Sequence, residues 1–106
     1  MLRGHTDAII LNLLSLKDSY GYEVHKAIIE ITGEQFALKE ATLYASFKRL
    51  EQEGHITPYW GDAFQGGRRK YYKITVTGLE KLDKYKKDWR FTLNVINSLL
   101  GLKNNE

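Results

Sequence analysis

Residues 40–74 read EATLYASFKRLEQEGHITPYWGDAFQGGRRKYYKI, and the spacing of the apolar residues changes within this stretch. Its first part places Leu43, Phe47 and Leu50 at helical spacing, which predicts a helix over residues 40–53. The second part has the pattern of two short strands with glycines between them, which is typical of a β-hairpin. A helix followed directly by a hairpin is the second half of a winged helix-turn-helix domain.

The hairpin is expected to pair residues 56–61 with residues 69–74, and Gly66-Gly67 is expected in the connecting turn. Pro58 has no N–H to donate to a sheet ladder, so its strand is expected at an edge of the sheet.

The tip of the hairpin carries three adjacent cations, Arg68, Arg69 and Lys70, and two tyrosines, Tyr71 and Tyr72, follow them. Such a tip can lie along a DNA backbone, and an arginine can enter a narrow minor groove. Cations on a hairpin also occur simply to keep an edge strand soluble. The preceding helix favours the first interpretation, because its exposed face is basic too.

That face carries small, polar and basic side chains, and two hydroxyl-bearing residues, Thr42 and Tyr44, flank it. Its residues are Ala41, Ala45, Lys48, Arg49 and Gln52. Small residues let a helix approach base edges, hydroxyls donate to phosphate oxygens, and cations neutralise phosphates. A basic helix and a basic hairpin tip in this order predict a protein that binds double-stranded DNA. The predicted DNA-binding residues of the two elements are Thr42, Tyr44, Lys48, Arg49, Arg68, Arg69, Lys70 and Tyr72.

Two further helices precede this region. Residues 7–16 are apolar on almost every side of a helix, which is typical of a helix buried all round, and in a small domain this suggests burial by a second subunit. A turn at residues 19–22 leads into a second helix, which Gly33 is expected to stop. A short extended connector is expected at residues 36–38.

From about residue 76 to Leu100 the sequence predicts one long helix, with either a capping box starting at Thr77 or Thr75 as its N-cap. Along it, residues recur in alternating steps of three and four, as in a coiled-coil seam with one polar member. The seam is formed by Leu79, Leu82, Lys86, Trp89, Leu93, Ile96 and Leu100. It is longer than the first three helices could cover, so it predicts a helix-mediated homodimer. The expected interface residues are Leu79, Leu82, Trp89, Ile96 and Leu100.

The sequence thus predicts a mainly α fold with a small β-hairpin. A winged helix-turn-helix domain is expected over residues 1–75, a C-terminal dimerisation helix over 76–102 and a flexible tail over 103–106. The chain has 106 residues, a net charge of +3 and no cysteine, which excludes disulfides and thiolate metal sites. No apolar run approaches the roughly 18 residues of a membrane span, so no membrane partner is expected. The lack of cysteine agrees with a reducing cytoplasm, where we expect the protein to act. No cofactor or metal ion is expected.

The residue pattern does not favour an enzyme. His5, His25 and His55 lie on different predicted elements without metal-ligand spacing, and no serine or carboxylate cluster suggests a nucleophile or an acid–base pair. A third class, a dimeric interaction module that never contacts DNA, is disfavoured by the three wing cations.

An ordered set of short motifs runs from residue 2 to residue 78, with Trp89 further on. The motifs are Leu2-Arg3-Gly4, Tyr20-Gly21-Tyr22-Glu23, Ala41-Thr42-Leu43-Tyr44, Phe47-Lys48-Arg49-Leu50-Glu51, Gly54-His55-Ile56, Tyr59-Trp60-Gly61, Gly66-Gly67-Arg68-Arg69-Lys70-Tyr71-Tyr72 and Thr75–Gly78. Together they resemble the PadR family of transcriptional regulators, in its short subfamily with one C-terminal helix.

The resemblance implies a homodimer held by its last and first helices. It implies a repressor of nearby genes that binds pseudo-palindromic operators, and those genes often serve drug efflux or the phenolic acid stress response. Thr42, Tyr44 and Lys48 would then lie on the reading helix. Gly67, Arg68 and Lys70 would lie on the wing.

Some short members bind flat aromatic drugs between paired tryptophans at the dimer centre, and Trp89 matches that tryptophan. Trp89 is equally well explained as a packing residue of a regulator that needs no ligand. Lys86 and Leu93, about one turn away on either side, argue against an apolar drug pocket. If Asp7 faces the same cavity and pairs with Lys86, the site would prefer a polar or charged ligand. The candidate ligand-binding residues for a small planar aromatic effector are Trp89, Lys86, Asp7 and Leu93.

Overall fold

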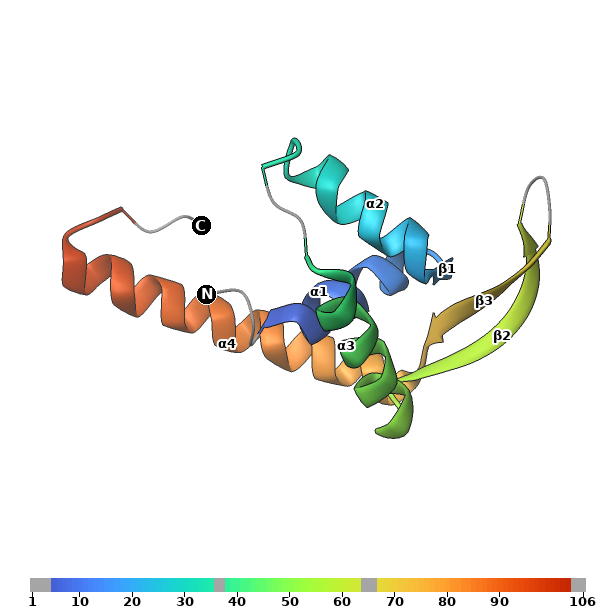
Figure 1. Cartoon of the computed structure of the whole chain (residues 1–106). Coiled ribbons are helices and arrows are strands. Elements are labelled where there is room, and N and C mark those ends of the chain that lie inside the picture. The colour runs from blue at the N-terminus through green and yellow to red at the C-terminus, as the bar shows by residue number, and fades with distance from the viewer. Residues whose placement is uncertain (1–4, 36–37, 64–66, 104–106) are drawn as a thin grey trace.

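The structure, a computed structural model, describes residues 5–35, 38–63 and 67–103 (Figure 1). Its elements are α1 (Thr6–Leu16), β1 (Ser19–Tyr20), α2 (Gly21–Ile31), α3 (Glu40–Gln52), β2 (Ile56–Ala63), β3 (Gly67–Ile74) and α4 (Val76–Leu100). The mainly helical fold with a small sheet and a long last helix is confirmed. The expected connector at Phe36-Ala37, Gly66 of the expected turn, and the tail beyond Lys103 lie outside the described residues.

The sheet has three antiparallel strands in the order β1-β3-β2. The prediction of a turn at residues 19–22 was wrong, because Ser19 and Tyr20 pair with β3 and α2 begins at Gly21. A two-residue strand is too short to show an alternating pattern in the sequence. Pro58 lies in β2, which is an edge strand as expected.

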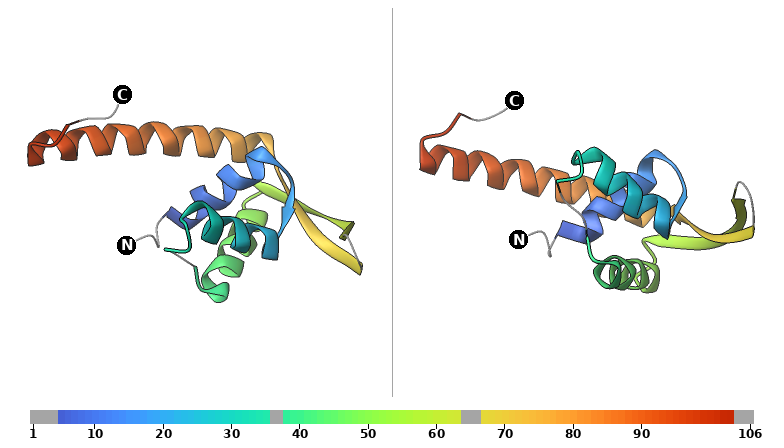
Figure 2. Two further views of the ribbon diagram at one scale, coloured as in Figure 1. Left: turned by 90° about the horizontal axis from the view of Figure 1, so that it is seen from above. Right: turned by 45° about the horizontal axis from the view of Figure 1, so that its top comes forward.

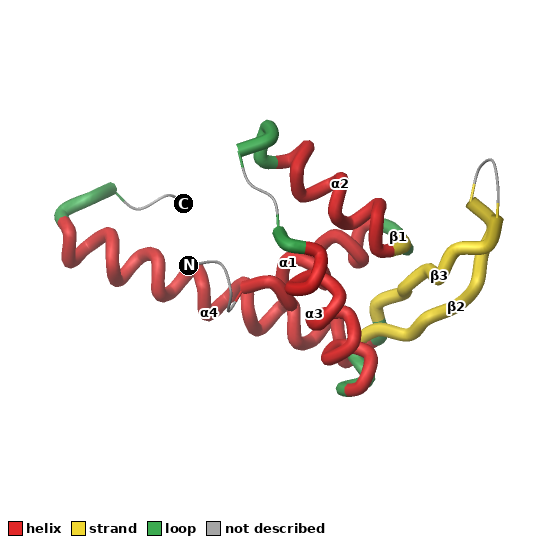
Figure 3. Tube along the Cα trace, in the orientation of Figure 1, coloured by secondary structure: helices red, strands yellow, loops and turns green. Residues whose placement is uncertain are grey.

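The hairpin is longer than the sequence predicts. Its register runs from Ile56 opposite Ile74 to Ala63 opposite Gly67. Gly67, expected in the turn, is therefore the first residue of β3. The hairpin and the C-terminal half of α4 project from opposite ends of the helical body (Figures 1 and 3).

The core lies where α1, α3 and the base of the hairpin meet. Its largest fully buried side chains include Phe47, Ile10, Leu11, Leu14, Leu43 and Leu50, and each contributes roughly 1.5–3 kcal/mol by burial. Tyr72 stacks on Phe47 with ring centroids 4.5 Å apart, so the middle of β3 is packed directly onto α3. The first helix is not buried on every side within one chain, because Leu16 is 73% exposed.

Thr75 is the N-cap of α4, because its Oγ1 accepts a hydrogen bond from the N–H of Gly78. Thr77 donates instead to the Gly54 carbonyl, so the alternative of a capping box at Thr77 was wrong. A Cβ on Gly78 would lie 2.2 Å from the His55 carbonyl oxygen, so only glycine lets the start of α4 pack this closely against the connection between α3 and β2.

The first half of α4 packs beside α1, and its second half extends away from the rest of the chain (Figure 2). In the described ranges, no helix combines the length and apolar character that crossing a bilayer requires.

Candidate nucleic-acid interface and long-helix face

The third helix places its buried stripe on the core and its basic side chains on the surface. Leu43, Phe47 and Leu50 are buried, whereas Tyr44 and Lys48 are exposed. Lys48 follows Tyr44 by four residues, so the two side chains lie on the same face of the helix. Arg49 is also exposed and contacts α1, and Thr42 is half-buried.

Arg49 is held at the edge of this face. Its Nε and Nη2 donate to the Asp7 carboxylate at 3.0 and 2.6 Å, and Nη2 also donates to Ser46 Oγ at 3.0 Å. Burial acts to raise the pKa of Asp7, but the hydrogen bonds from Arg49 and Ser46 outweigh it and lower that pKa.

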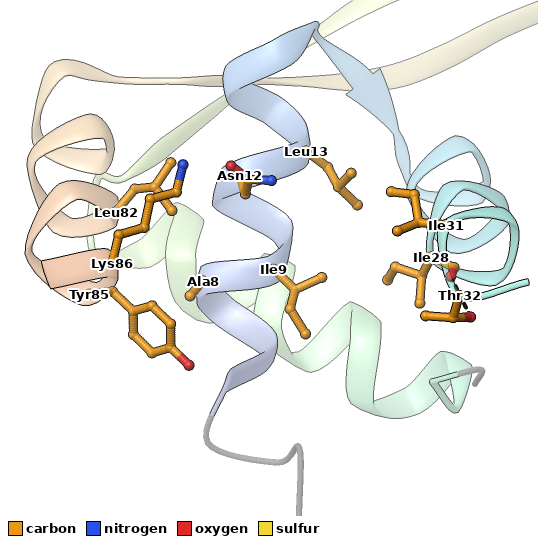
Figure 4. A pocket seen from close by; sticks show the side chains of 10 residues that line it. All are labelled: Ala8, Ile9, Asn12, Leu13, Ile28, Ile31, Thr32, Leu82, Tyr85 and Lys86. Atoms are coloured by element: carbon orange, nitrogen blue, oxygen red, sulfur yellow. Dashed lines mark hydrogen bonds between the residues drawn. The ribbon is translucent and has the colours of Figure 1, made fainter. Parts of the chain in front are cut away.

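Within one chain, Asp7 therefore does not pair with Lys86, the arrangement that would have given a polar ligand site. Asp7 lies on the side of α1 that faces α3, whereas Lys86 lines the opposite side of α1 together with Asn12 (Figure 4).

On the wing, each of the three adjacent cations lies over an aromatic ring from a different strand. The Cζ of Arg68 is 5.3 Å from the Trp60 ring centroid in β2, and the Cζ of Arg69 is 5.9 Å from the Tyr20 ring centroid in β1. The Nζ of Lys70 is 5.4 Å from the Tyr72 ring centroid in β3 itself. Contacts of this kind hold long cationic side chains in place before any partner arrives.

Lys70 also contacts the third helix, with its Nζ 3.4 Å from Glu51 Oε1. Partial burial acts to lower the pKa of Lys70, but Tyr72 and Glu51 outweigh it and raise that pKa. Lys70 is therefore a cation that bridges the wing and α3.

Behind the cations, a row of rings joins the hairpin to β1. Tyr20 packs edge-on against Tyr71, with centroids 5.4 Å apart, and Tyr71 stacks on Tyr59 at 5.6 Å. The Tyr59 hydroxyl donates to Asp18 Oδ2 at 2.6 Å, and this hydrogen bond raises the pKa of Tyr59 to about 12. No pattern in the sequence assigned a role to Tyr20, Tyr59 or Asp18. The facing positions of Tyr59 and Tyr71 in the hairpin register could have indicated the stack of those two rings.

The four candidate ligand-binding residues do not surround one cavity within a single chain. An apolar pocket of about 320 Å³ lies between α1, α2 and α4, and Lys86 lines it (Figure 4). Trp89 lies instead against His5, with ring centroids 5.2 Å apart, and His5 is hydrogen-bonded to Tyr85. Sequence reasoning missed His5 and Tyr85 as neighbours of Trp89.

The outer part of α4 exposes a broad apolar surface. Of the expected interface residues, Leu79, Trp89, Ile96 and Leu100 are 47%, 46%, 46% and 67% exposed. Leu82 differs, because it is buried in the core of the single chain. A second stripe, which the seam did not include, adds Phe91, Val95 and Leu99.

Across residues 5–35, 38–63 and 67–103, no three histidine, aspartate or glutamate side chains gather as a metal site would require. A helix, a short strand, two further helices and a hairpin in this order, with a basic helix beside a basic hairpin, define a winged helix-turn-helix protein. Residues 10–84 match the Transcriptional regulator PadR-like family, and the chain belongs to that family.

Similar proteins support the same class. A transcriptional regulator from Clostridium thermocellum is 44% identical, with a TM-score of 0.83 over 92% of this chain and 94% of that chain. Bacillus subtilis PadR in complex with operator DNA is 26% identical, with a TM-score of 0.65 over 74% of this chain and 45% of that chain. Uncharacterized protein X of Lysinibacillus sphaericus is 47% identical over 96 residues, which cover 91% of this chain and 88% of that protein. The chain is a transcriptional regulator and not an enzyme.

Proposed function

We propose that this protein is a repressor that binds a pseudo-palindromic operator in double-stranded DNA as a homodimer. Residues 1–75 would bind DNA, residues 76–102 would form the dimer, and the protein would act in the cytoplasm, where it meets DNA. The observation that carries the proposal is the basic surface formed by Lys48 of α3 together with the wing cations. Each of the three wing cations, Arg68, Arg69 and Lys70, lies over an aromatic ring. The complex of Bacillus subtilis PadR with operator DNA supports this function.

The dimer is proposed from the exposed apolar surface of α4. Trp89 and Ile96 are seven residues apart and are both 46% exposed, so they can form a seam with the same residues of a second chain. The apolar pocket beside α1 and α4 adjoins this helix and offers further apolar surface for the partner. A two-fold axis across the seam would place two reading helices on successive turns of DNA.

A planar aromatic effector is proposed to bind at the two Trp89 side chains. Seam residues near the middle of paired helices meet close to the two-fold axis, where two indoles can enclose a flat ring. Such a ligand would release DNA only if it binds more tightly to the arrangement that cannot bind DNA. Lys86 would favour an anionic compound, because its candidate partner Asp7 is occupied by Arg49.

One observation favours a regulator that needs no ligand. The rings of Trp89 and His5 are already in contact within one chain, as expected of a packing residue. Titration of phenolic acids and other planar aromatics into a Trp60→Phe variant separates the two functions. Quenching of Trp89 fluorescence together with loss of DNA binding would support the effector. If the titration produces neither quenching nor loss of DNA binding, Trp89 is a packing residue.

DNA binding is tested by fluorescence anisotropy with the DNA upstream of the protein's own gene, at several salt concentrations. Lys48→Ala, Arg68→Ala and Lys70→Ala should each weaken binding and lower the salt slope by about one unit. Lys87→Ala, on the exposed side of α4, changes the net charge equally and should leave both unchanged. If all four variants bind like the wild type, the proposed surface is wrong.

A further inference from the structure

A second feature of the wing is a cleft of about 320 Å³ between the start of α2, the exposed face of α3 and the wing. We call it the α2–wing cleft. It is lined by Tyr20, Gly21 and Tyr22 of β1 and α2, by Tyr44 of α3, and by Arg69 and Lys70 of β3. The pairing of β1 with β3 brings these segments together although they are about fifty residues apart in sequence.

The polar groups that line the cleft are mostly hydrogen-bond donors. Arg69 enters from β3 with its guanidinium over the Tyr20 ring, and Tyr20 is held in turn by Tyr71. Lys70, the next residue of β3, also lines the cleft. Glu51 engages it only weakly, because their charged atoms are 3.4 Å apart and both side chains are partly exposed. Two cations and several phenol hydroxyls in one concave surface match the acceptor oxygens of a phosphate.

Gly21 determines how the α3 side of the cleft is built. A Cβ at this position would lie 2.8 Å from Cε1 and 2.9 Å from the hydroxyl oxygen of Tyr44. The absence of a side chain therefore lets the Tyr44 ring lie against the first residue of α2. Because Tyr44 precedes Lys48 by one helical turn, the cleft borders the exposed basic face of α3.

We propose that the α2–wing cleft binds one backbone phosphate of the DNA, with Arg69 and Lys70 supplying charge and Tyr22 and Tyr44 supplying hydroxyl donors. The proposal rests on the DNA binding proposed above and adds a named contact to it. Tyr22 is 61% exposed, and no pattern in the sequence assigned it to DNA. Tyr20 acts as a positioning residue, because it contacts the Arg69 side chain.

The phosphate is identified with DNA in which one phosphate at a time is replaced by an uncharged methylphosphonate. At one position per half-site, this replacement should weaken binding of the wild type but have little further effect on Arg69→Gln. Tyr22→Phe should weaken binding several-fold, whereas Thr92→Val removes an exposed hydroxyl from α4 and should not. If each methylphosphonate weakens binding of Arg69→Gln as much as it weakens binding of the wild type, at every position, the cleft does not bind a backbone phosphate.

Gly21→Ala tests the shape of the cleft without removing any charge or hydroxyl. The new methyl group should displace Tyr44, so binding should weaken several-fold while the salt slope and the thermal midpoint change little. Unchanged affinity would show that the position of Tyr44 against Gly21 is irrelevant to binding. If Gly21→Ala folds poorly, Tyr44→Phe tests the same side chain by removing its hydroxyl donor, and unchanged affinity would exclude Tyr44 from the phosphate contact.

The source of the phosphate is tested on the protein alone. Inorganic phosphate should shift the amide NMR signals of Gly21 and Tyr22 only at millimolar concentrations, because the DNA backbone supplies its phosphate together with many other contacts. Saturation at micromolar phosphate would identify a free-anion site and overturn the assignment to DNA. If Lys48→Ala weakens DNA binding as expected while Tyr22→Phe and Arg69→Gln have no effect, the cleft does not bind phosphate. The proposal that the protein binds DNA would still stand in that case.

Discussion

Arg49 of α3 and Asp7 of α1 form a two-point contact, from Nε to Oδ2 at 3.0 Å and from Nη2 to Oδ1 at 2.6 Å. Only 19% of the Asp7 side chain is exposed, against 49% for Arg49. Because α1 also packs against α4, the Asp7–Arg49 pair connects α3, the helix proposed to read DNA, through α1 to the long helix α4. A planar guanidinium that binds both oxygens of a carboxylate fixes orientation as well as distance.

The Asp7–Arg49 pair should make stability depend on acid. The pKa of Asp7 is lowered below its ordinary value of 3.8, so the pair contributes stability above that value and loses it as the pH falls through the folded-state pKa. Asp7→Asn should therefore lower the free energy of unfolding by about 1 kcal/mol near neutral pH. Below about pH 3.8 the difference from the wild type should shrink. Urea unfolding at both pH values and at one protein concentration measures this, and a difference that stays constant would contradict it.

Glu51 should weaken DNA binding, because it engages Lys70 and carries a negative charge beside the wing. Glu51→Gln should tighten binding up to about fivefold, the upper range for an exposed ion pair. Glu30→Gln, on the exposed side of α2, makes the same change in net charge away from the wing and serves as the control. Equal tightening in both variants would mean that only net charge matters.

Trp60 should affect DNA binding only through Arg68. Its ring lies 5.3 Å from the Arg68 guanidinium carbon and is itself exposed. Trp60→Ala should weaken binding by about two- to fivefold, the equivalent of 0.5–1 kcal/mol for an exposed cation–π contact. The same substitution should have little effect in an Arg68→Ala background. Equal losses in both backgrounds, measured by anisotropy as a double-mutant cycle, would show that Trp60 acts independently of Arg68.

The apolar surface of α4 should hold the dimer. Ile96→Glu places a charge in the proposed seam and should convert the dimer to monomer at micromolar concentration, because an unpaired charge is costly to bury. Arg90→Glu is a larger charge change on the polar side of the same helix and should leave the dimer intact. Light scattering distinguishes these outcomes, and a folded wild-type monomer at this concentration would contradict the seam.

The order of the elements could be predicted from the sequence because each has a strong local pattern. The seam residues of α4 and the stripe of Leu43, Phe47 and Leu50 have helical spacing over several turns. Pro58 predicted an edge strand, because a residue without an N–H cannot donate to the ladder of a central strand. The two-residue strand β1 could not be predicted, because Ser19 and Tyr20 are strand residues only through their pairing with β3.

The sequence was enough to name the cations of the proposed DNA-binding surface, but it did not reveal the rings that these cations contact. Consecutive charges such as Arg68, Arg69 and Lys70 are visible in a sequence, whereas the rings below them come from three strands. The partner of Asp7 could not be predicted for the same reason: which side of α1 faces α3 depends on packing between elements forty residues apart. Spacing along one helix carries no information of that kind.

The measurement that tests the proposed function most directly is hydroxyl-radical footprinting of the DNA upstream of the gene. A homodimer that binds through α3 and the wing should protect two half-sites related by an inverted repeat, with centres about one or two helical turns apart. Lys48→Ala and Arg68→Ala should weaken both protected segments together. A single unsymmetrical protected segment, or protection that persists unchanged in both variants, would contradict DNA binding by a dimer through this surface.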